Sequence, residues 1–556
     1  MAVTEPAAWP VARRRPAFGW RLLQLAIALA VAAPLAALFP YLFHSAGDYW
    51  GHALTNVLPE TVSNTLILLA GVGAGTIVGG VAAAWLVTMC RFPGRGLFEW
   101  ALILPLAMPA YVMAYVYTDL LQFAGPVQSA LRAATGWQHG DYWFPRIHSI
   151  GGAVLMLTMV LYPYVYLLAR SAFLAQSICV IDVGRTLGCG PWAVFFRVAL
   201  PLARPAIVAG AALALMETLA DFGTVAFFGV PTFTTGIYRA WFAYGNPVAA
   251  AQLSLILLVL AFGLLATERW ARGDRRFHHT SRRYRPLPDY PLTGWRAAAA
   301  FAVCLVPIVL GFLLPAGVLF GHLIDATQLP YPPRYVEFAR NSLLLASVAA
   351  VVAVLIAALL AYAVRLRPAR LAEAINRFAA MGYAIPGSIV AVGVLIPLTA
   401  VDHLVDGWSR QAFGIATGLL LTGGLFGLVY AYCVRFLAIA LQSVEGALAK
   451  VTMSMDDAAR SLGESPRGVL WRVHRPLVSG GLLTAGLIVF VDVMKELPAT
   501  LIVRPLNLDT LAVQVFNLVA DERLAEAAPA ALSIVAAGLI PVLILSRLIA
   551  ASRPGA

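Results

Sequence analysis

The feature that most limits the fold of this chain is a series of long apolar stretches that recurs from one end of the sequence to the other. A helix that crosses a bilayer needs roughly 20 apolar residues, and twelve stretches reach that length. A water-soluble chain of 556 residues would need far more than 12% charged residues to cover its surface. Membrane helices instead expose apolar side chains to lipid and satisfy their backbone internally, so the sequence predicts an all-α membrane protein. The expected spans are residues 20–42, 63–88, 98–123, 147–170, 198–228, 248–267, 297–321, 341–364, 379–400, 412–440, 476–502 and 527–546.

Arginines in the short segments between these spans indicate how the chain is oriented. With the N-terminus in the cytoplasm, thirty of the 39 Lys and Arg residues fall on the cytoplasmic side, as the positive-inside rule requires. We therefore expect both termini in the cytoplasm, and we interpret the net charge of +12 as a topology signal rather than a nucleic-acid-binding surface. The arginines before the first span resemble a signal peptide. That apolar stretch exceeds the roughly 7–15 residues of a signal sequence, so an uncleaved span is expected.

The second half of the sequence repeats the first at an offset of about 275 residues. Both copies of the clearest match, residues 182–188 and 457–463, fall on the cytoplasmic side, which requires an even number of spans between them. Two parallel six-span repeats, related by an axis along the membrane normal, satisfy this condition. We expect a first repeat at 1–267, a basic cytoplasmic linker at 268–296 and a second repeat at 297–556. Further matched pairs are Asn64 with Asn341, Pro109 with Pro386, Pro201 with Pro476, Asp221 with Glu496, and Thr235 with Thr510.

Each repeat contains a cytoplasmic loop, at about 177–201 and 452–476, whose sequence predicts two short helices. In the second loop Ser454 and Asp457 have the spacing of a capping box, Gly463 ends the first helix, and Pro466 begins the next. The first loop has the same glycine break but lacks the serine cap. A short amphipathic helix between spans can lie on lipid or dock a soluble partner, and its occurrence twice favours docking.

This loop resembles the E-A-A-x-x-x-G-x(9)-I-x-L-P motif of the permease subunits of ATP-binding-cassette importers, with Asp182 and Asp457 in place of glutamate. The resemblance implies the type I importer permease fold in a bacterial inner membrane. It also implies as partners two copies of an ATP-hydrolysing subunit, one for each coupling loop, and a periplasmic substrate-binding protein, besides the lipid bilayer. In the first loop Val183 and Gly184 replace the two alanines of the motif. The residues assigned to ATPase coupling are Asp182, Gly184, Gly188, Pro201, Asp457, Ala458, Ala459, Gly463 and Pro476.

Motifs for ATP hydrolysis or metal binding are absent from the sequence. A phosphate-binding G-x-x-x-x-G-K-[ST] loop needs a lysine after glycine, but Lys450 follows Ala449 and Lys495 follows Met494. The histidines lack HExxH spacing and the cysteines form no CxxC pair. We therefore expect no enzyme activity, no bound cofactor and no metal site in this chain, with ATP used by the partner subunit.

Two stretches, residues 217–242 and 495–500, look like the matching parts of fused ferric-iron importer permeases, which implies ferric iron as the substrate. Related permeases for thiamine, polyamines, sulfate or aminoethylphosphonate share parts of these stretches and remain alternatives. A secondary transporter driven by an ion gradient could also have twelve spans, but it would not explain the duplicated loops.

The same regions place charged residues in or at the outer ends of spans, where they usually face a cavity or a partner. One interpretation is that the carboxylates line a path for a hard cation, which prefers oxygen ligands. The other is that salt bridges, such as Asp492 or Glu496 with Lys495 or Arg504, hold an outer gate. The candidate residues are Glu217, Asp221, Asp492, Lys495 and Glu496.

Overall fold

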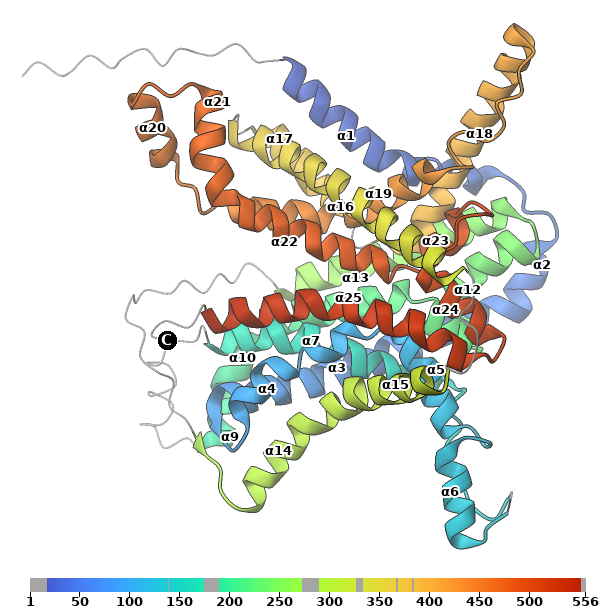
Figure 1. Cartoon of the computed structure of the whole chain (residues 1–556), viewed down its shortest axis with the longest axis vertical. Coiled ribbons are helices and arrows are strands. Elements are labelled where there is room, and N and C mark those ends of the chain that lie inside the picture. Colours follow the sequence, from blue (N-terminus) through green and yellow to red (C-terminus); the bar gives the residue numbers. More distant parts are fainter. Residues whose placement is uncertain are drawn as a thin grey trace, which may run out of the picture.

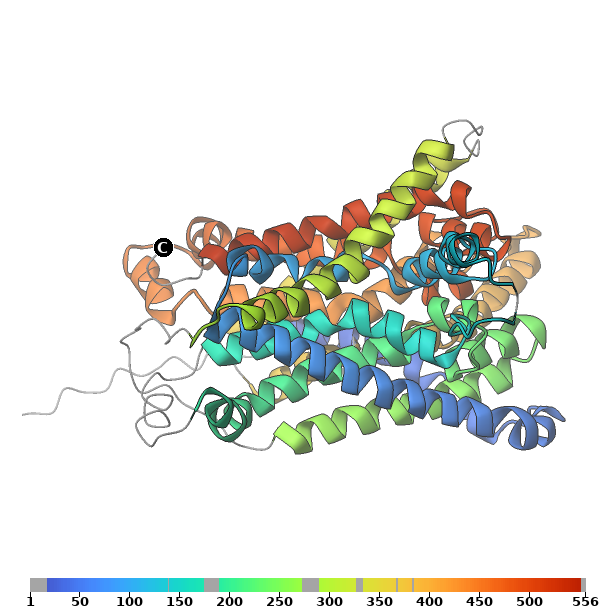
Figure 2. The same cartoon turned by 90° about the horizontal axis from the view of Figure 1, so that it is seen from below.

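The computed structural model describes residues 18–138, 140–174, 190–272, 290–326, 334–366, 369–382 and 385–551. Within these residues the chain is a bundle of long helices with one two-residue parallel pairing of β1 with β2. The two views show most of the long helices running in similar directions along the bundle (Figure 1, Figure 2). Asp182, Gly184 and Gly188 of the first loop, and most of the 268–296 linker, lie outside the described residues.

Short helices and single 3-10 or π-helical segments, labelled η, extend or connect the long helices. The elements before residue 273 are α1 (Phe18–Ala36), η1 (Phe39–Phe43), α2 (Tyr49–His52), η2 (Ala53–Val57), α3 (Leu58–Met89), β1 (Cys90–Arg91), α4 (Arg95–Ala101), η3 (Leu104–Ala107), α5 (Ala110–Leu121), α6 (Pro126–Thr135), α7 (Ile150–Leu174), α9 (Pro191–Val194), η4 (Phe195–Ala199), α10 (Leu200–Ala220), α11 (Gly223–Phe227), α12 (Phe233–Tyr238), η5 (Arg239–Ala243) and α13 (Pro247–Arg272). The elements after residue 289 are β2 (Tyr290–Pro291), α14 (Trp295–Ile308), η6 (Val309–Leu313), α15 (Leu314–Ala326), α16 (Tyr335–Leu366), α17 (Arg370–Ala379), α18 (Gly387–Phe413), α19 (Leu425–Leu448), α20 (Met453–Ser461), α21 (Pro466–Val469), η8 (Leu470–His474), α22 (Arg475–Met494), α23 (Pro498–Val503), α24 (Leu511–Ala520) and α25 (Leu524–Ala551).

Eleven helices among the described residues are long and apolar enough to cross a membrane, and one bent pair brings the number to twelve. This agrees with the twelve spans predicted from the sequence. The bent pair, Arg95–Ala107 with Ala110–Thr135, turns by 91°, and Pro109 lies at the break. Pro109 and its repeat partner Pro386 both precede a helix, with φ and ψ of −62° and 137° in one and −52° and 140° in the other. The two prolines therefore occupy equivalent positions, as the sequence repeat predicts.

The boundaries around the loop between α18 and α19 differ from the predicted spans 379–400 and 412–440. The first of these helices ends at Phe413 and the second begins at Leu425. The apolar, glycine-rich sequence between them suggested a helix, but hydrogen bonds hold it in another conformation. Asp402 accepts bonds from two successive backbone nitrogens of the loop at 2.8 and 2.9 Å. A buried carboxylate with backbone partners therefore decides the structure where hydropathy alone does not.

Glycines on α3 allow this helix to approach α7 closely. A Cβ atom on Gly75 would lie 2.7 Å from Thr158, and one on Gly80 would lie 2.8 Å from Val165 and 2.9 Å from the backbone oxygen of Tyr162. In a bilayer the hydrophobic effect does not drive helices together, because lipid tails are as apolar as the side chains. Close packing of this kind is therefore a main source of helix association. The small residues of α3 are therefore part of what holds the first half together.

The first span of each sequence half packs against the other half. The N-terminal helix α1 contacts α16, α17 and α18, whereas α14 contacts α3 and α4, and α15 contacts α5. The two sequence halves are therefore interlocked. The boundaries 1–267, 268–296 and 297–556 stay predictions of the sequence repeat.

Matched hydrogen bonds support the duplication. Asn64 Nδ2 donates to the carbonyl of Pro231 at 3.1 Å, and Asn341 Nδ2 donates to the carbonyl of Asp509 at 3.2 Å. The asparagines are 277 residues apart and their acceptors are 278 residues apart. Each bond ties the loop before a short helix, α12 or α24, to the first turns of a long one, α3 or α16.

Candidate functional site

All five charged residues that the sequence singles out line one cavity of about 120 Å³. Its walls come from α5, α7, α10 and α11 of the first half and from α19, α22 and α23 of the second. Both halves therefore contribute charge at the same place. Intramembrane charges are costly unless they face a cavity or one another, and here they do both. The five residues are Glu217, Asp221, Asp492, Lys495 and Glu496.

Arg435 is a cavity residue that the sequence interpretation misplaced, because the positive-inside count puts it among the cytoplasmic cations. It lies within α19, is 7% exposed, and places Nη1 2.7 Å from Glu496 Oε1. A single arginine inside an apolar run was the signal that could have found it, since such a residue needs a buried partner. Gly387 makes room for this pair, because a Cβ atom there would lie 2.1 Å from Arg435 Nη1 and 2.6 Å from Glu496 Oε1.

A second ion pair in the cavity joins Lys495 Nζ to Asp492 Oδ1 at 2.8 Å. This is one of the pairs expected if the charges brace a gate. Arg504, the other cation considered from the sequence, pairs with Asp509 instead. Two carboxylates of the second half are thus already matched with cations inside the cavity.

The matched residues Asp221 and Glu496 each end a long helix and begin a short one. Asp221 follows α10 and accepts hydrogen bonds from Thr224 Oγ1 at 3.0 Å and from a backbone nitrogen of α11 at 3.1 Å. Glu496 follows α22 and accepts a hydrogen bond from a backbone nitrogen of α23 at 3.0 Å. Each carboxylate satisfies an otherwise unpaired donor at a helix start. The predicted continuous spans 198–228 and 476–502 are therefore broken at these residues.

Side chains of α5 and α11 separate this cavity from another hollow. A Cβ atom on Gly223 would lie 2.6 Å from Tyr111 and 2.9 Å from Leu497, so the two halves touch beside the cavity. Tyr115 packs on Phe227 with ring centroids 4.6 Å apart, and both line a pocket of about 400 Å³. Closing contacts between the halves therefore lie between the two hollows.

The cavity is not built as a metal cage. Among the described residues, no group of three or more His, Cys, Asp or Glu side chains is arranged to hold a metal ion. A cation that passes through the cavity would compete with Arg435 and Lys495 for the carboxylates. The electrostatics therefore suit a gate that opens at least as well as a binding site.

The second repeated loop, at 452–476, forms α20, which ends at Gly463 as predicted. Gly463 has φ of 87°, the left-handed conformation that glycine adopts without strain. The nitrogens of Glu464 and Gly463 bond to the carbonyls of Ala459 and Arg460 at 3.1 and 3.0 Å, which is a Schellman ending. The next helix, α21, starts at Pro466 as predicted.

The start of α20 differs from the prediction. Its N-cap is Thr452, and Ser454 lies inside the helix with its hydroxyl 2.8 Å from that of Thr452, so the capping box of Ser454 with Asp457 is wrong. The Asp457 side chain is 72% exposed, 3.5 Å from Arg460. Ala458 is also exposed, whereas Ala459 is buried. An open edge of α20 therefore faces outward at the end of the bundle opposite α12 and α24 (Figure 1).

The two prolines of the coupling motif lie where the loops enter the bundle. Pro201 and Pro476 occupy the first turns of α10 and α22, directly after the π-helical segments η4 and η8. The first loop is described only from residue 190 onward, so the part that corresponds to α20 in the sequence lies outside the described residues.

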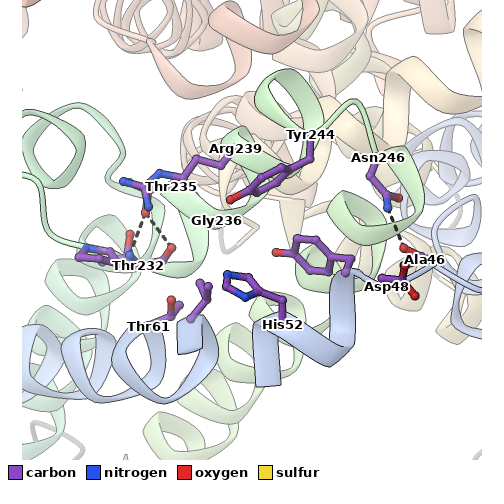
Figure 3. Close-up of a pocket in the computed structure, with 13 residues that line it drawn as sticks. Ala46, Asp48, His52, Thr61, Thr232, Thr235, Gly236, Arg239, Tyr244 and Asn246 are labelled. Carbon is purple, nitrogen blue, oxygen red and sulfur yellow. Dashed lines mark hydrogen bonds between the residues drawn. The ribbon is translucent and has the colours of Figure 1, made fainter. Parts of the chain in front are cut away.

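A pocket of about 350 Å³ lies at the other end of the bundle, within the first half (Figure 3). Its side chains come from α2, the start of α3, α12, η5 and adjoining loops. Figure 3 shows the His52 ring and the Tyr244 hydroxyl pointing into it, while Thr235 Oγ1 accepts a hydrogen bond from the nitrogen of Thr232 at 2.8 Å. The pocket draws no residue from the second half, so it lies apart from the shared cavity.

Twelve candidate spans and a charged cavity between two interlocked halves define a membrane permease. The model of the family described as binding-protein-dependent transport system inner membrane component matches residues 71–268. The chain belongs to this family.

Similar proteins match either about a third of the chain or most of it. The Fe(3+)-transport system permease protein FbpB 2 of Haemophilus influenzae is 26% identical over 543 residues, which cover 96% of this chain and 99% of that protein. The molybdenum transport system permease protein ModB of Escherichia coli K12 is 32% identical over 203 residues, 35% of this chain and 86% of that protein. The ferric transport system permease protein FbpB of Actinobacillus pleuropneumoniae is 20% identical over 521 residues, 88% of this chain and 72% of that protein.

Proposed function

We propose that this chain is the permease subunit of a ferric-iron importer that is powered by ATP hydrolysed in a separate subunit. The observation that carries the proposal is the cavity in which charged residues of both halves meet. Similarity to an Fe(3+)-transport permease extends over 96% of this chain. Similarity to the molybdenum and 2-aminoethylphosphonate permeases extends over 35% and 37%. The two shorter relatives are themselves matched over 86% and 73% of their length, so the difference reflects the two-half architecture shared with the Fe(3+)-transport permease. We propose ferric iron as the cargo on this likeness over the whole chain.

We place the translocation path at Glu217, Asp221, Asp492, Lys495 and Glu496. Carboxylate oxygens suit a hard cation, and the ion pairs of Asp492 and Glu496 hold the two oxygens back until the path opens. In this scheme the contact of Gly223 with Leu497 closes the path between the halves. Parting of the halves then opens the cavity to the passing ion, which competes with Arg435 and Lys495 for the carboxylates, because both ion pairs lie within the second half.

We propose that energy enters through the two cytoplasmic loops, at 177–201 and 452–476. The exposed edge of α20 at Asp457 and Ala458 suits docking of a soluble partner, and the sequence repeat assigns the same role to Asp182. Two ATPase subunits would then bind, one at each loop, and this chain would need no ATPase site of its own. The termini lie on the same cytoplasmic side, and a periplasmic binding protein delivers the cargo at the opposite end.

The test is uptake into proteoliposomes that contain this chain with its cognate ATPase, supplied with binding protein loaded with radiolabelled ferric iron. We expect uptake to need both ATP and binding protein. Arginine at Asp182 and Asp457 together should abolish uptake by repelling the partner surface. Arginine at Glu373, whose side chain is 47% exposed on α17 outside both loops, is the matched control and should leave uptake unchanged.

Other outcomes would contradict one part of the proposal and leave the rest in place. ATP-dependent uptake of molybdate, thiamine, a polyamine, sulfate or 2-aminoethylphosphonate, without uptake of iron, would keep the class of protein and overturn the cargo. Uptake that ignores ATP and follows an ion gradient would overturn the energy source.

A further inference from the structure

A buried charged cluster holds the second coupling helix on the bundle. Asp456 lies on the inner face of α20, one residue before the exposed Asp457, and is 3% exposed. Its Oδ2 accepts a hydrogen bond from Arg365 Nη2 at 3.0 Å, and its Oδ1 lies 2.6 Å from His474 Nε2. His474 Nδ1 is bonded in turn to the hydroxyl of Tyr362. Neutral His474 satisfies both contacts when Nε2 donates to Asp456 and Nδ1 accepts from Tyr362.

The partners of Asp456 belong to different membrane helices. Arg365 is in the last turn of α16, and His474 is the residue directly before α22. Arg365 Nη1 also donates to the carbonyls of Leu448 and Val451, at 3.2 and 2.8 Å, at the end of α19. One carboxylate on α20 is therefore tied to the ends of three long helices. Charge-assisted bonds in a buried site are stronger than neutral ones.

The first half has no counterpart of this cluster in its sequence. At offsets of 275 and 277 residues, Asp456, His474 and Arg365 correspond to Ile181, Ala199 and Thr88. Tyr362 corresponds to Trp85, which instead packs against Phe173 and Phe195 with ring centroids 5.6 and 4.8 Å apart. Ile181 lies outside the described residues, but an isoleucine has no charge to offer. The residues of this cluster are therefore not repeated at the aligned positions of the first half.

We propose that Asp456 is a positioning residue that fixes the second coupling helix to α16 and α22, so that movement of this loop is passed to those two spans instead of being taken up within the loop. The inference rests on the proposed function and deepens it. Coupling of ATP hydrolysis to transport then depends on the buried ion pair of Asp456 with Arg365.

Neutralising Asp456 tests the attachment of α20 to the bundle without changing the exposed edge proposed to dock the ATPase. Asp456→Asn leaves the exposed edge of α20 unchanged but leaves Arg365, 12% exposed at its side chain, without its carboxylate. Removing one partner of a buried pair is strongly unfavourable, so α20 should sample other positions. Asp456→Glu keeps the negative charge and should therefore retain much of the wild-type attachment of α20. Asp457→Asn alters the exposed neighbour on the proposed docking edge and is the matched control for the nitroxide distances alone.

The experiment uses the full chain with its ATPase in proteoliposomes and has three readouts. They are the amount of ATPase subunit retained, the ratio of iron taken up to ATP hydrolysed, and the distance between nitroxides at Leu462→Cys on the α20 end and Leu355→Cys on α16, in a background without the native cysteines. For Asp456→Asn we expect retained ATPase, a roughly fivefold or greater fall in the ratio, and a broadened distance distribution. A purely structural role would lower uptake and hydrolysis together and leave the ratio unchanged.

Asp457→Asn should leave the distance distribution unaltered. A wild-type ratio and distribution in Asp456→Asn would overturn the proposal, and so would proportional loss of both activities. If Asp456→Asn does not accumulate, His474→Gln takes its place. This variant keeps the ion pair of Asp456 with Arg365, so it should lower the ratio and broaden the distance distribution in the same direction, but by less than is expected for Asp456→Asn. If the wild-type complex takes up no iron, the proposed cargo fails, while the nitroxide distances and ATP hydrolysis still decide whether Asp456 positions the helix.

Discussion

The ion pair of Arg435 with Glu496 allows a sharp test of whether the cavity charges brace the structure. The perturbation is a set of three variants, Glu496→Gln, Arg435→Met and the double replacement. The single variants each remove one partner of a pair whose side chains are 8% and 5% exposed and whose atoms lie 2.7 Å apart. The double variant removes both charges of this pair and leaves the other charged residues of the cavity in place.

The expected magnitude follows from burial and distance. Two unit charges about 4 Å apart attract by about 4 kcal/mol at an effective dielectric constant of 20, and removal of one partner of a buried pair costs about 3–5 kcal/mol. Asp492 and Glu217 line the same cavity and offset part of the loss at Arg435. The glutamine amide also keeps an acceptor for the first turn of α23. We therefore expect a loss of about 3 kcal/mol for each single variant and about 1 kcal/mol for the double.

The assay is reversible unfolding of the purified chain in mixed detergent micelles, analysed as a double-mutant cycle. The two single losses should exceed the loss in the double variant, with a coupling energy of several kcal/mol. Additive losses would refute the reasoning, because they would mean that the two charges do not depend on each other. Transport by the double variant, measured beside it, shows whether the carboxylate is also needed for the cargo.

Three further predictions follow from other parts of the structure. Gly80→Val should lower the free energy of unfolding by about 2 kcal/mol because its new atoms meet the α7 backbone, whereas Gly79→Ala, whose Cβ atom would have its nearest neighbour 3.9 Å away, should have little effect. Asp402→Ala should cost about 2–3 kcal/mol and speed hydrogen exchange in the loop before α19, and unchanged exchange would contradict this. Burial raises the pKa of the Asp456 carboxyl, but its hydrogen bonds with His474 and Arg365 and the positive charge of Arg365 lower it below its ordinary value of 3.8. A lowered carboxyl pKa contributes stability above the unfolded-state value of about 3.9 that is lost as pH falls through the folded value, so the α20–α16 nitroxide distance should hold from pH 7 to 5 and broaden only below about pH 4.

The sequence predicted the number of spans and their order because long apolar stretches leave few alternatives in a bilayer. It also predicted the glycine that ends α20, since the position needs a left-handed residue. Helix boundaries were harder where polar side chains act on the backbone. Asp221, Glu496 and Asp402 each accept backbone hydrogen bonds that end a helix or hold a loop. Hydropathy averages over such residues and continues the span through them.

The cavity was partly predictable. Ionisable residues in apolar runs are rare, and this rarity marks the five charged residues predicted from the sequence. It marks Arg435 equally, but the positive-inside count assigns that residue to the cytoplasmic side. A positive-inside count treats every cation as a surface residue, although a cation in the middle of a 24-residue helix cannot reach either interface. The pairing itself could not be predicted, since it depends on how α19 lies against the break after α22. The burial of Asp456 could not be predicted from the coupling motif either, because the motif begins at Asp457, the exposed residue beside it.

The interlocking of the first spans changes what can move in a transport cycle. A sequence repeat of two six-span halves suggests that residues 1–267 and 297–556 rock against each other. In the structure α1 is packed on α16, α17 and α18, and α14 and α15 are packed on helices of the first half. Rocking of the sequence halves as rigid bodies would separate α1 from α16, α17 and α18, and would separate α14 and α15 from α3, α4 and α5, although α15 packs most extensively on α25 of its own half. We therefore expect α1 to move with the second half, and the surfaces that part to include those that meet at the charged cavity and at the contact of Gly223 with Leu497.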